Sequence, residues 1–287
     1  MIIELLNQAV GPVIAIFLVT AMFSLGLDLT VGQITQALRN KRLVAKSAVV
    51  NFVLIPLVAI AITRLIPMDN ALRMGIVLYA LSAGTEGGPK FVQIVRGNTA
   101  FAFGLLVVML VFTVSLVPVI LSLVMPGAHI SIGELVSKLI LVVALPIGVG
   151  LYLSSRREKL AARLNPIFHR ASMVMLWLLF VLLVYVNLDA IATLPVNALM
   201  GGLLLFALAF AIGYIGGGPA TENRRALAIM SFARNGSISM MIAREVFTDV
   251  PEVLVMTTVM AAASVILAVL AVVCMRPLKT PQGIDLK

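Results

Sequence analysis

The chain has 287 residues, of which 61% are hydrophobic and only 11% are charged, and its formal net charge is +9. Soluble domains are about 45–50% apolar and about 25% charged, so this composition indicates an integral membrane protein. The basic residues lie in short loops without an aromatic-basic patch, which argues against nucleic-acid binding. One cysteine, Cys274, and two histidines provide no candidate metal site, and no hydrolase triad or phosphate loop is present. Neither a cofactor nor an enzymatic activity is expected.

Apolar runs of the length of a transmembrane helix, about 20 residues, follow one another along the chain. The alternating pattern of an outer-membrane barrel is missing from the sequence. We therefore predict an all-α polytopic membrane protein that forms a single membrane domain over residues 1–287. Nine spans are predicted, at 8–27, 44–63, 73–95, 99–125, 132–154, 167–188, 196–216, 224–246 and 252–275.

The basic residues in the loops predict the orientation of the chain. When successive loops are assigned to alternate sides, one side holds only Arg64, Arg73, Lys138 and Arg244. The opposite side holds most of the others, among them Arg39, Lys41, Arg156, Arg224, Arg276, Lys279 and Lys287. Because cytoplasmic loops carry the excess of Lys and Arg, the N-terminus is expected outside and the C-terminus in the cytoplasm. A bacterial inner membrane fits this topology.

The third predicted span contains the sequence "GTEGGPKF" at 84–91, which is unsuited to lipid. Its helix breakers are Gly84, Gly87, Gly88 and Pro89, and its charges are Glu86 and Lys90. A helix interrupted in hydrocarbon frees backbone groups that each cost several kcal/mol unless they face protein, water or a ligand. Glycines let the backbone approach a ligand closely, and proline suits the first turn of a re-entering helix. The break therefore predicts a ligand cavity, with a kink of no function as the alternative.

The eighth predicted span contains a second interruption, "SFARNGSIS" at 231–239. Setting Gly84 on Gly236 also places Arg73 over Arg225 and Thr85 over Ser237. The third span runs inward in the predicted topology and the eighth runs outward. Equivalent elements of opposite orientation are typical of the inverted repeats of secondary transporters. The repeat halves would cover about 8–125 and 132–275.

The two interruptions together carry more positive than negative charge. A Lys or Arg in the middle of a membrane helix costs about 2.5–3.5 kcal/mol, so Lys90 and Arg234 are expected to face a pathway or a partner. Glu86 is the one acidic residue within the two interrupted segments, 84–91 and 231–239. A structural ion pair of Glu86 with Lys90 is an alternative. One carboxylate cannot neutralise two cations, so the cavity is expected to be electropositive and to suit an anion.

Candidate substrate contacts follow from the chemistry of these side chains. Arg234 offers a planar fork to an anion, and Lys90 offers a point charge. The neutral candidates are Asn51, Asn235, Ser237, Thr85 and the backbone at Gly84, Gly87 and Gly88. Glu86 is a candidate proton carrier, because burial favours its neutral form while nearby cations favour its ionised form. A permanent counterion is the other interpretation of Glu86.

Four segments resemble the bile acid:sodium symporter family of ten-helix carriers. They are "MFSLGLDLT" at 22–30, "NFVLIP" at 51–56, "SAGTEGGPKFVQIVRGN" at 82–98 and "RRALAIMSFARNGSISMMIA" at 224–243. The resemblance implies that the first of the ten helices is missing here. It also implies a core domain at about 44–125 and 196–275, containing two crossing broken helices, and a panel domain at about 8–27 and 132–188. Substrate would be reached between the two domains.

The chain departs from the family at the positions that bind sodium in sodium-coupled relatives. By the resemblance, the Ser-Asn pair falls on Gly88 and Pro89, hydroxyl residues fall on Ala102 and Leu106, and a Glu and a Gln fall on Met230 and Arg234. Asn51, where relatives have a Gln, could still coordinate an ion. Hard cations need several oxygen ligands, and most of these side-chain oxygens have been lost. Sodium coupling is therefore expected to be absent or altered, with Lys90 and Arg234 supplying fixed positive charge.

The function expected from these observations is transport of a small organic anion by alternating access, either secondary active or facilitative. The expected partners are this anion and the lipid bilayer, with the proton as a candidate coupling ion. Two alternatives remain open. One is a sodium-coupled organic anion symporter of the bile acid type, and the other is a nontransporting membrane sensor or binding protein.

Overall fold

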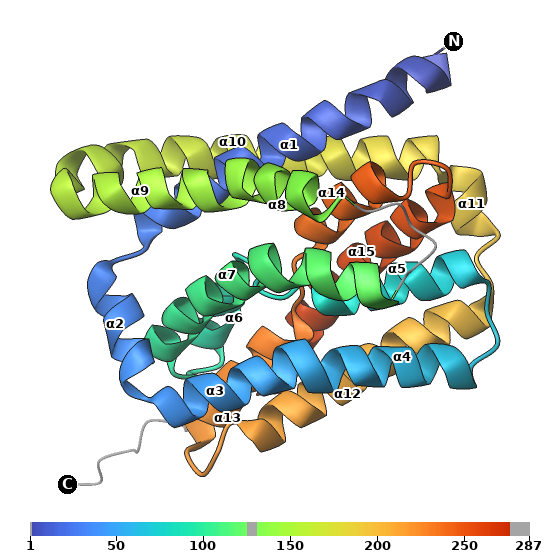
Figure 1. The fold of residues 1–287 in the computed structure, drawn as a ribbon. Helices are drawn as coiled ribbons and strands as arrows, with labels where there is room; N and C mark the ends of the chain where they lie inside the picture. Colours follow the sequence, from blue (N-terminus) through green and yellow to red (C-terminus); the bar gives the residue numbers. More distant parts are fainter. Residues whose placement is uncertain (1, 125–130, 276–287) are drawn as a thin grey trace, which may run out of the picture.

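A computed structural model describes residues 2–124 and 131–275, and all regular structure in these ranges is helical. Figure 1 shows the helices in chain order, coloured from the N-terminus to the C-terminus. They are α1 (Ile2–Asp28), α2 (Val31–Arg39), α3 (Lys41–Val49), the π-helical segment η1 (Val50–Leu54), α4 (Ile55–Leu65), α5 (Asn70–Leu81), α6 (Gly88–Ile94), α7 (Thr99–Val124), α8 (Ile132–Leu139), the π-helical segment η2 (Ile140–Ala144), α9 (Leu145–Arg156), α10 (Glu158–Val186), α11 (Leu188–Ala192), α12 (Val196–Gly216), α13 (Thr221–Phe232), α14 (Gly236–Val246) and α15 (Pro251–Met275).

Within the described ranges, eight helices are long and apolar enough to cross a membrane. The predicted all-α class is therefore confirmed. Three of the eight are composite: α3, η1 and α4 run together, as do α8, η2 and α9, and the segment of α13 and α14 counts as one. The third predicted span is divided between α5, with 12 residues, and α6, with 7 residues. Nine spans result only when α5 and α6 are taken together as one broken span.

One predicted helix start needed correction. Helix α10 begins at Glu158, well before the predicted start at 167, and contains Pro166. Proline removes only one backbone donor, and the preceding Asn165 bonds through its side chain to Asp28 on α1, which holds this turn in place. Helices α2 and α11 were not predicted, because both are too short to show a membrane-span pattern. The predicted span end at 125 and the loop residues Arg276, Lys279 and Lys287 lie outside the described residues.

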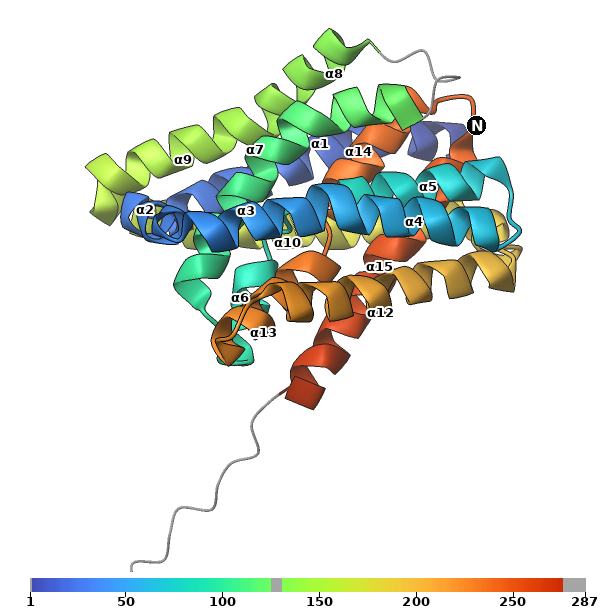
Figure 2. The same cartoon turned by 60° about the horizontal axis from the view of Figure 1, so that its bottom comes forward.

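The helices form two groups that are visible in Figure 1. Helix α1 packs against α9 and α10. In the other group, α12 packs against α13 and α4, and α5 packs against α15. Figure 2, a view turned by 60°, shows α12, α13 and α15 on the side away from α8 and α9. The two broken helices thus lie mainly within the second group.

Helices α1 and α9 approach each other so closely that only glycine fits between them. A Cβ atom on Gly26 would lie 2.4 Å from the carbonyl oxygen of Ile147, and one on Gly150 would lie 2.6 Å from that of Phe23. These obstacles are backbone atoms, which cannot turn away as a side chain can. Gly26 belongs to the segment "MFSLGLDLT" singled out in the sequence, so packing explains this part of the motif.

The substitution Gly26→Ala is expected to destabilise the protein by about 1–3 kcal/mol, because the added methyl group must push α1 and α9 apart. Thermal unfolding of the purified protein in detergent measures the effect. Gly148→Ala on α9 is the matched control, because its Cβ would have no atom within 4 Å. Equal melting temperatures for the two variants would show that the close contact does not constrain the packing.

Candidate functional site at the crossing of two broken helices

The first break follows α5 at Leu81 and ends where α6 begins at Gly88. Gly84 within it has a φ of +90°, a conformation that strongly favours glycine. Freed backbone groups in this segment find partners on other helices. The carbonyl oxygen of Ala83 accepts a hydrogen bond of 2.9 Å from the hydroxyl of Thr113 on α7. The predicted interruption of the third span is therefore confirmed, and its backbone is partly satisfied by the protein.

The second break separates α13, which ends at Phe232, from α14, which begins at Gly236. Asn235 caps α14, because its Oδ1 accepts a hydrogen bond of 3.0 Å from the backbone N–H of Ile238. Asparagine is among the preferred residues at this position, since it satisfies one of the free N–H groups of the first turn. The predicted interruption of the eighth span is confirmed as well.

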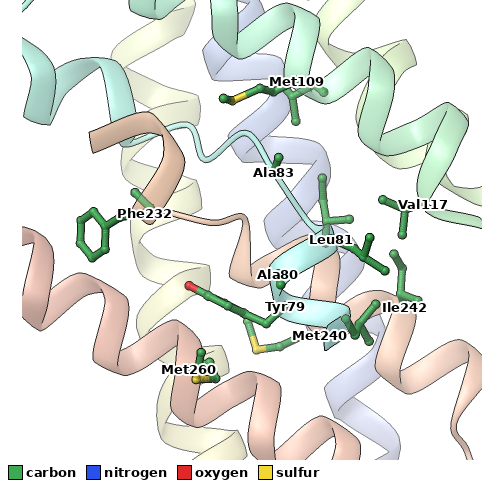
Figure 3. Packing of buried hydrophobic residues seen from close by; sticks show 14 of the residues in the cluster. Tyr79, Ala80, Leu81, Ala83, Met109, Val117, Phe232, Met240, Ile242 and Met260 are labelled. Carbon is green, nitrogen blue, oxygen red and sulfur yellow. The ribbon is translucent and has the colours of Figure 1, made fainter. Parts of the chain in front are cut away.

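Asn235 joins the two breaks to each other. Its backbone N–H donates to the carbonyl oxygen of Ser82 at 2.8 Å, and its Nδ2 donates to that of Gly84 at 2.8 Å. The same Nδ2 lies 3.5 Å from Oε2 of Glu86. Figure 3 shows the two unwound segments running past one another, with Ala83 in the first segment and Phe232 at the start of the second. The crossing expected from the sequence is therefore made by direct hydrogen bonds.

A second set of contacts joins the broken helices at the end of α6, in the "RGN" segment at 96–98. The backbone N–H of Asn98 donates to the carbonyl oxygen of Glu222 at 3.1 Å, and its Nδ2 donates to Oδ1 of Asn223 at 2.9 Å. Nη1 of Arg225 donates to the carbonyl oxygen of Val95 at 3.1 Å. The start of α13 is thus held against the end of α6, which fixes the two broken helices at two separate points.

Arg234 lies beside the crossing and is only 4% exposed. Its Nη1 donates a long hydrogen bond of 3.4 Å to the carbonyl oxygen of Asn51 in η1. Its Nε and Nη2 have no acceptor within the described residues. Asn51 itself is fully buried, and its Nδ2 donates to Ser231 Oγ at 3.2 Å, while its Oδ1 has no partner there. The structure thus brings together two of the predicted contact residues, Asn51 and Arg234.

The other predicted contacts are distributed around this point. Ser237 is buried in the first turn of α14, and Thr85, Glu86 and Gly87 are half-buried in the first break. Lys90 is exposed on α6. Among the ion pairs of the described residues, none joins Lys90 to Glu86. The structure therefore does not pair Lys90 with Glu86. Lys90 was expected at the buried crossing, but it lies outside it.

Five of the six positions that the resemblance aligns with sodium ligands are occupied by apolar residues without a side-chain oxygen. Gly88, Pro89, Ala102, Leu106 and Met230 are all buried. A Cβ on Gly88 would lie 2.6 Å from the sulfur of Met230, so this thioether fills the space directly beside the first break. These five side chains offer no oxygen ligand, and a hard cation could not be held by them.

Sequence reasoning missed Tyr79, whose hydroxyl is fully buried and has no hydrogen-bond partner within the described residues. Its ring packs edge-on against Phe206 at 5.8 Å, and Phe206 packs in the same way against Phe232. Tyr79 lies two residues before the end of α5, and Figure 3 shows its side chain among those of Phe232, Met240 and Met260. The available signal was one hydroxyl in the apolar run "IVLYAL" just before the first break.

The fold and the crossing define the class of protein. The residues that the structure describes are helical and include eight helices long and apolar enough to cross a membrane, as in a polytopic membrane protein. The sequence model of the sodium bile acid symporter family matches residues 15–194, which is more than half of the chain. The chain belongs to this family of membrane transporters. A comparison with curated proteins gave no match.

Proposed function

We propose that this transporter carries a small organic anion by alternating access, as a secondary active or facilitative carrier, with sodium coupling absent or altered. The observation that best supports the proposal is the buried guanidinium of Arg234, whose Nε and Nη2 have no acceptor within the described residues. A buried charge without a partner costs several kcal/mol. A carboxylate or sulfonate at the crossing would supply both the countercharge and the acceptors.

Of the proposed contact residues, some would attract the approaching anion and others would bind it at the crossing. Lys90 is exposed, so its ammonium would act on an anion that approaches from solvent. Arg234 is buried and would act on an anion that has reached the crossing. Ser237 and Thr85 would donate neutral hydrogen bonds, as would the glycine backbone of the first break. Asn235 has already committed its Oδ1 and Nδ2 to the protein, so we assign it to shaping the site.

The proposed inverted repeat is supported by matching neighbours. Helices α5 and α13 each have 12 residues and each precede a break. Helix α5 packs against α15, and its counterpart α13 packs against α7. In the same way, α6 packs against α7, and its counterpart α14 packs against α15. This exchange of partners is expected when 70–124 and 221–275 are equivalent units of opposite orientation.

The proposed domains follow the two groups of helices described above. We propose a panel of about 8–27 and 132–188 and a core of about 44–125 and 196–275. The packing of α1 against α9 and α10 supports the panel. The hydrogen bonds of the crossing lie entirely within the core, so the core would move as one unit against the panel.

The proposed loss or alteration of sodium coupling rests on the replacement of oxygen ligands. Met230 places sulfur beside Gly88, and Arg234 places its guanidinium on the carbonyl oxygen of Asn51. A fixed cation at this point would stabilise the freed carbonyl groups without being transported. Glu86, half-buried beside Asn235, would serve either as a proton carrier or as a permanent counterion.

Ligand-dependent thermal stability tests the proposal. The purified protein is expected to be stabilised by some members of a panel of carboxylates and sulfonates, to the same extent with sodium and with choline as the cation. Saturable stabilisation by sodium alone, with nothing added by Met230→Glu, would support the sodium-coupled alternative instead.

Counterflow in proteoliposomes separates a carrier from a sensor, using the anion that stabilises most. A carrier exchanges labelled for unlabelled anion, whereas a nontransporting sensor binds it without exchange. An imposed pH gradient then distinguishes the two roles of Glu86. Uptake that responds to the gradient in the parent and not in Glu86→Gln supports proton coupling, and an unresponsive parent supports the counterion role.

A further inference from the structure

The side-chain polar contacts between the proposed panel and the proposed core gather at one end of the molecule. Lys138 on α8 forms an ion pair with Glu245 on α14. Nη1 and Nη2 of Arg244, also on α14, donate hydrogen bonds of 3.0 Å to the Oδ1 and the carbonyl oxygen of Asn7 on α1. Within the described ranges, no other side-chain hydrogen bond or ion pair joins α1 or α8–α10 to the core. These contacts therefore connect parts that alternating access would separate.

By the predicted topology, this end faces outside, because Lys138 and Arg244 belong to the few basic residues of the outer loops. Helix α14 begins at the crossing, at Gly236, and ends at Val246 beside these contacts. It therefore leads from the proposed binding site to the outer surface, and its last turn holds both core members of the contact set.

A partly open pocket of about 200 Å³ lies beside the contacts, between α1, η2 and α14. Its apolar wall includes Ile14, Leu141 and Met241, and Lys138, Arg244 and Glu245 line it as well. Gly11 also lines it, and a Cβ at this position would meet no atom within 4 Å. The space is thus bounded by panel helices on one side and by the core half-helix on the other.

The ion pair is well placed to open and close. The side chains of Lys138 and Glu245 are 50% and 39% exposed, so water screens their attraction. Exposed pairs contribute little to stability, and separating one is easy.

We propose that Asn7, Lys138, Arg244 and Glu245 form an outer latch that closes the external route to the crossing, and that the pocket beside it is the outer part of this route. This inference rests on the proposed alternating access. The latch biases the protein toward the conformation closed to the outside, and its loss shifts the population toward the one open to the outside.

Labelling of a single cysteine from outside tests the latch. In a Cys274→Ser background, Gly11→Cys places a thiol at the pocket, and a membrane-impermeant thiol reagent is added to intact cells. We expect Glu245→Gln and Arg244→Gln each to raise the labelling rate roughly two- to fivefold, as expected from the loss of an exposed polar contact. The exchanged pair Lys138→Glu with Glu245→Lys is expected to restore the slow rate.

Matched controls are Glu252→Gln and Arg64→Gln, which change exposed residues without side-chain partners among the described contacts. Unchanged rates in both latch variants, an equal rise in the controls, or a fast rate in the exchanged pair would each overturn the latch. Monodisperse elution of every variant excludes misfolding as the cause. Labelling is measured without substrate, so its outcome is independent of counterflow, which tests transport itself.

Discussion

Alanine at position 235 is expected to lower the free energy of unfolding by about 2–4 kcal/mol. The substitution removes the cap of α14, because Ile238 loses its acceptor. It also leaves the buried carbonyl oxygen of Gly84 without its donor. An unsatisfied buried polar group and a lost cap each cost on the order of 1–2 kcal/mol, and both losses fall on one residue. Chemical or thermal unfolding in detergent provides the measurement.

The control for Asn235→Ala is Asn40→Ala. Asn40 caps α3 through a bond of 3.1 Å from the backbone N–H of Leu43, but it is exposed. Its loss is therefore expected to cost about 1 kcal/mol, the value of a cap alone. The variant Asn235→Asp keeps an acceptor for the backbone N–H of Ile238, so it retains the cap. It loses the donor to the carbonyl oxygen of Gly84 and adds a negative charge near Glu86. A loss no larger for position 235 than for position 40 would contradict the role of Asn235 in joining the breaks.

If the proposed function holds, replacing Arg234 by alanine is expected to reduce uptake of the proposed organic anion roughly 30-fold or more. Truncating one partner of a buried charged contact costs about 2–5 kcal/mol, and 1.4 kcal/mol corresponds to a factor of ten. The substrate would lose its countercharge, and the carbonyl oxygen of Asn51 would lose its donor. Initial uptake rates in proteoliposomes, normalised to the amount of folded protein, measure the effect.

Two further variants show whether the loss of uptake in Arg234→Ala comes from a lost contact with the anion. Arg234→Lys keeps the charge but not the planar fork, so an intermediate rate is expected. Arg64→Ala removes an exposed arginine and is expected to leave uptake unchanged. Uptake at the parental rate in Arg234→Ala would remove this residue from the transport site. An equal loss in Arg64→Ala would indicate a general charge effect.

Hydropathy predicted most of the helices because lipid imposes both their length and their apolar composition. The range predicted for α12, 196–216, agrees with the structure at both ends. The predicted start of α10 was too late, because the first turns of this helix are polar and contain Pro166. Contacts with α1 stabilise these turns in the structure. Such tertiary contacts leave no periodic signal in a single sequence.

The breaks were predictable, but the directions of their side chains were not. Glycine and charge within an apolar run reveal an interruption, whereas the orientation after it depends on how the next half-helix packs. Lys90 therefore proved to be exposed and Arg234 buried, although the sequence treats both as cations near a break. The partner of Arg234 is a backbone carbonyl group, that of Asn51, which no residue type could reveal.

The bond between the backbone N–H of Asn235 and the carbonyl oxygen of Ser82 has a wider consequence. Main-chain groups are the same whichever amino acids carry them, proline excepted, so this bond survives changes in the surrounding side chains. The arrangement of the half-helices therefore does not depend on the side chains that line the site. A carrier built on such a junction can change the side chains beside it, such as those at positions 230 and 234, and still keep its two half-helices in register.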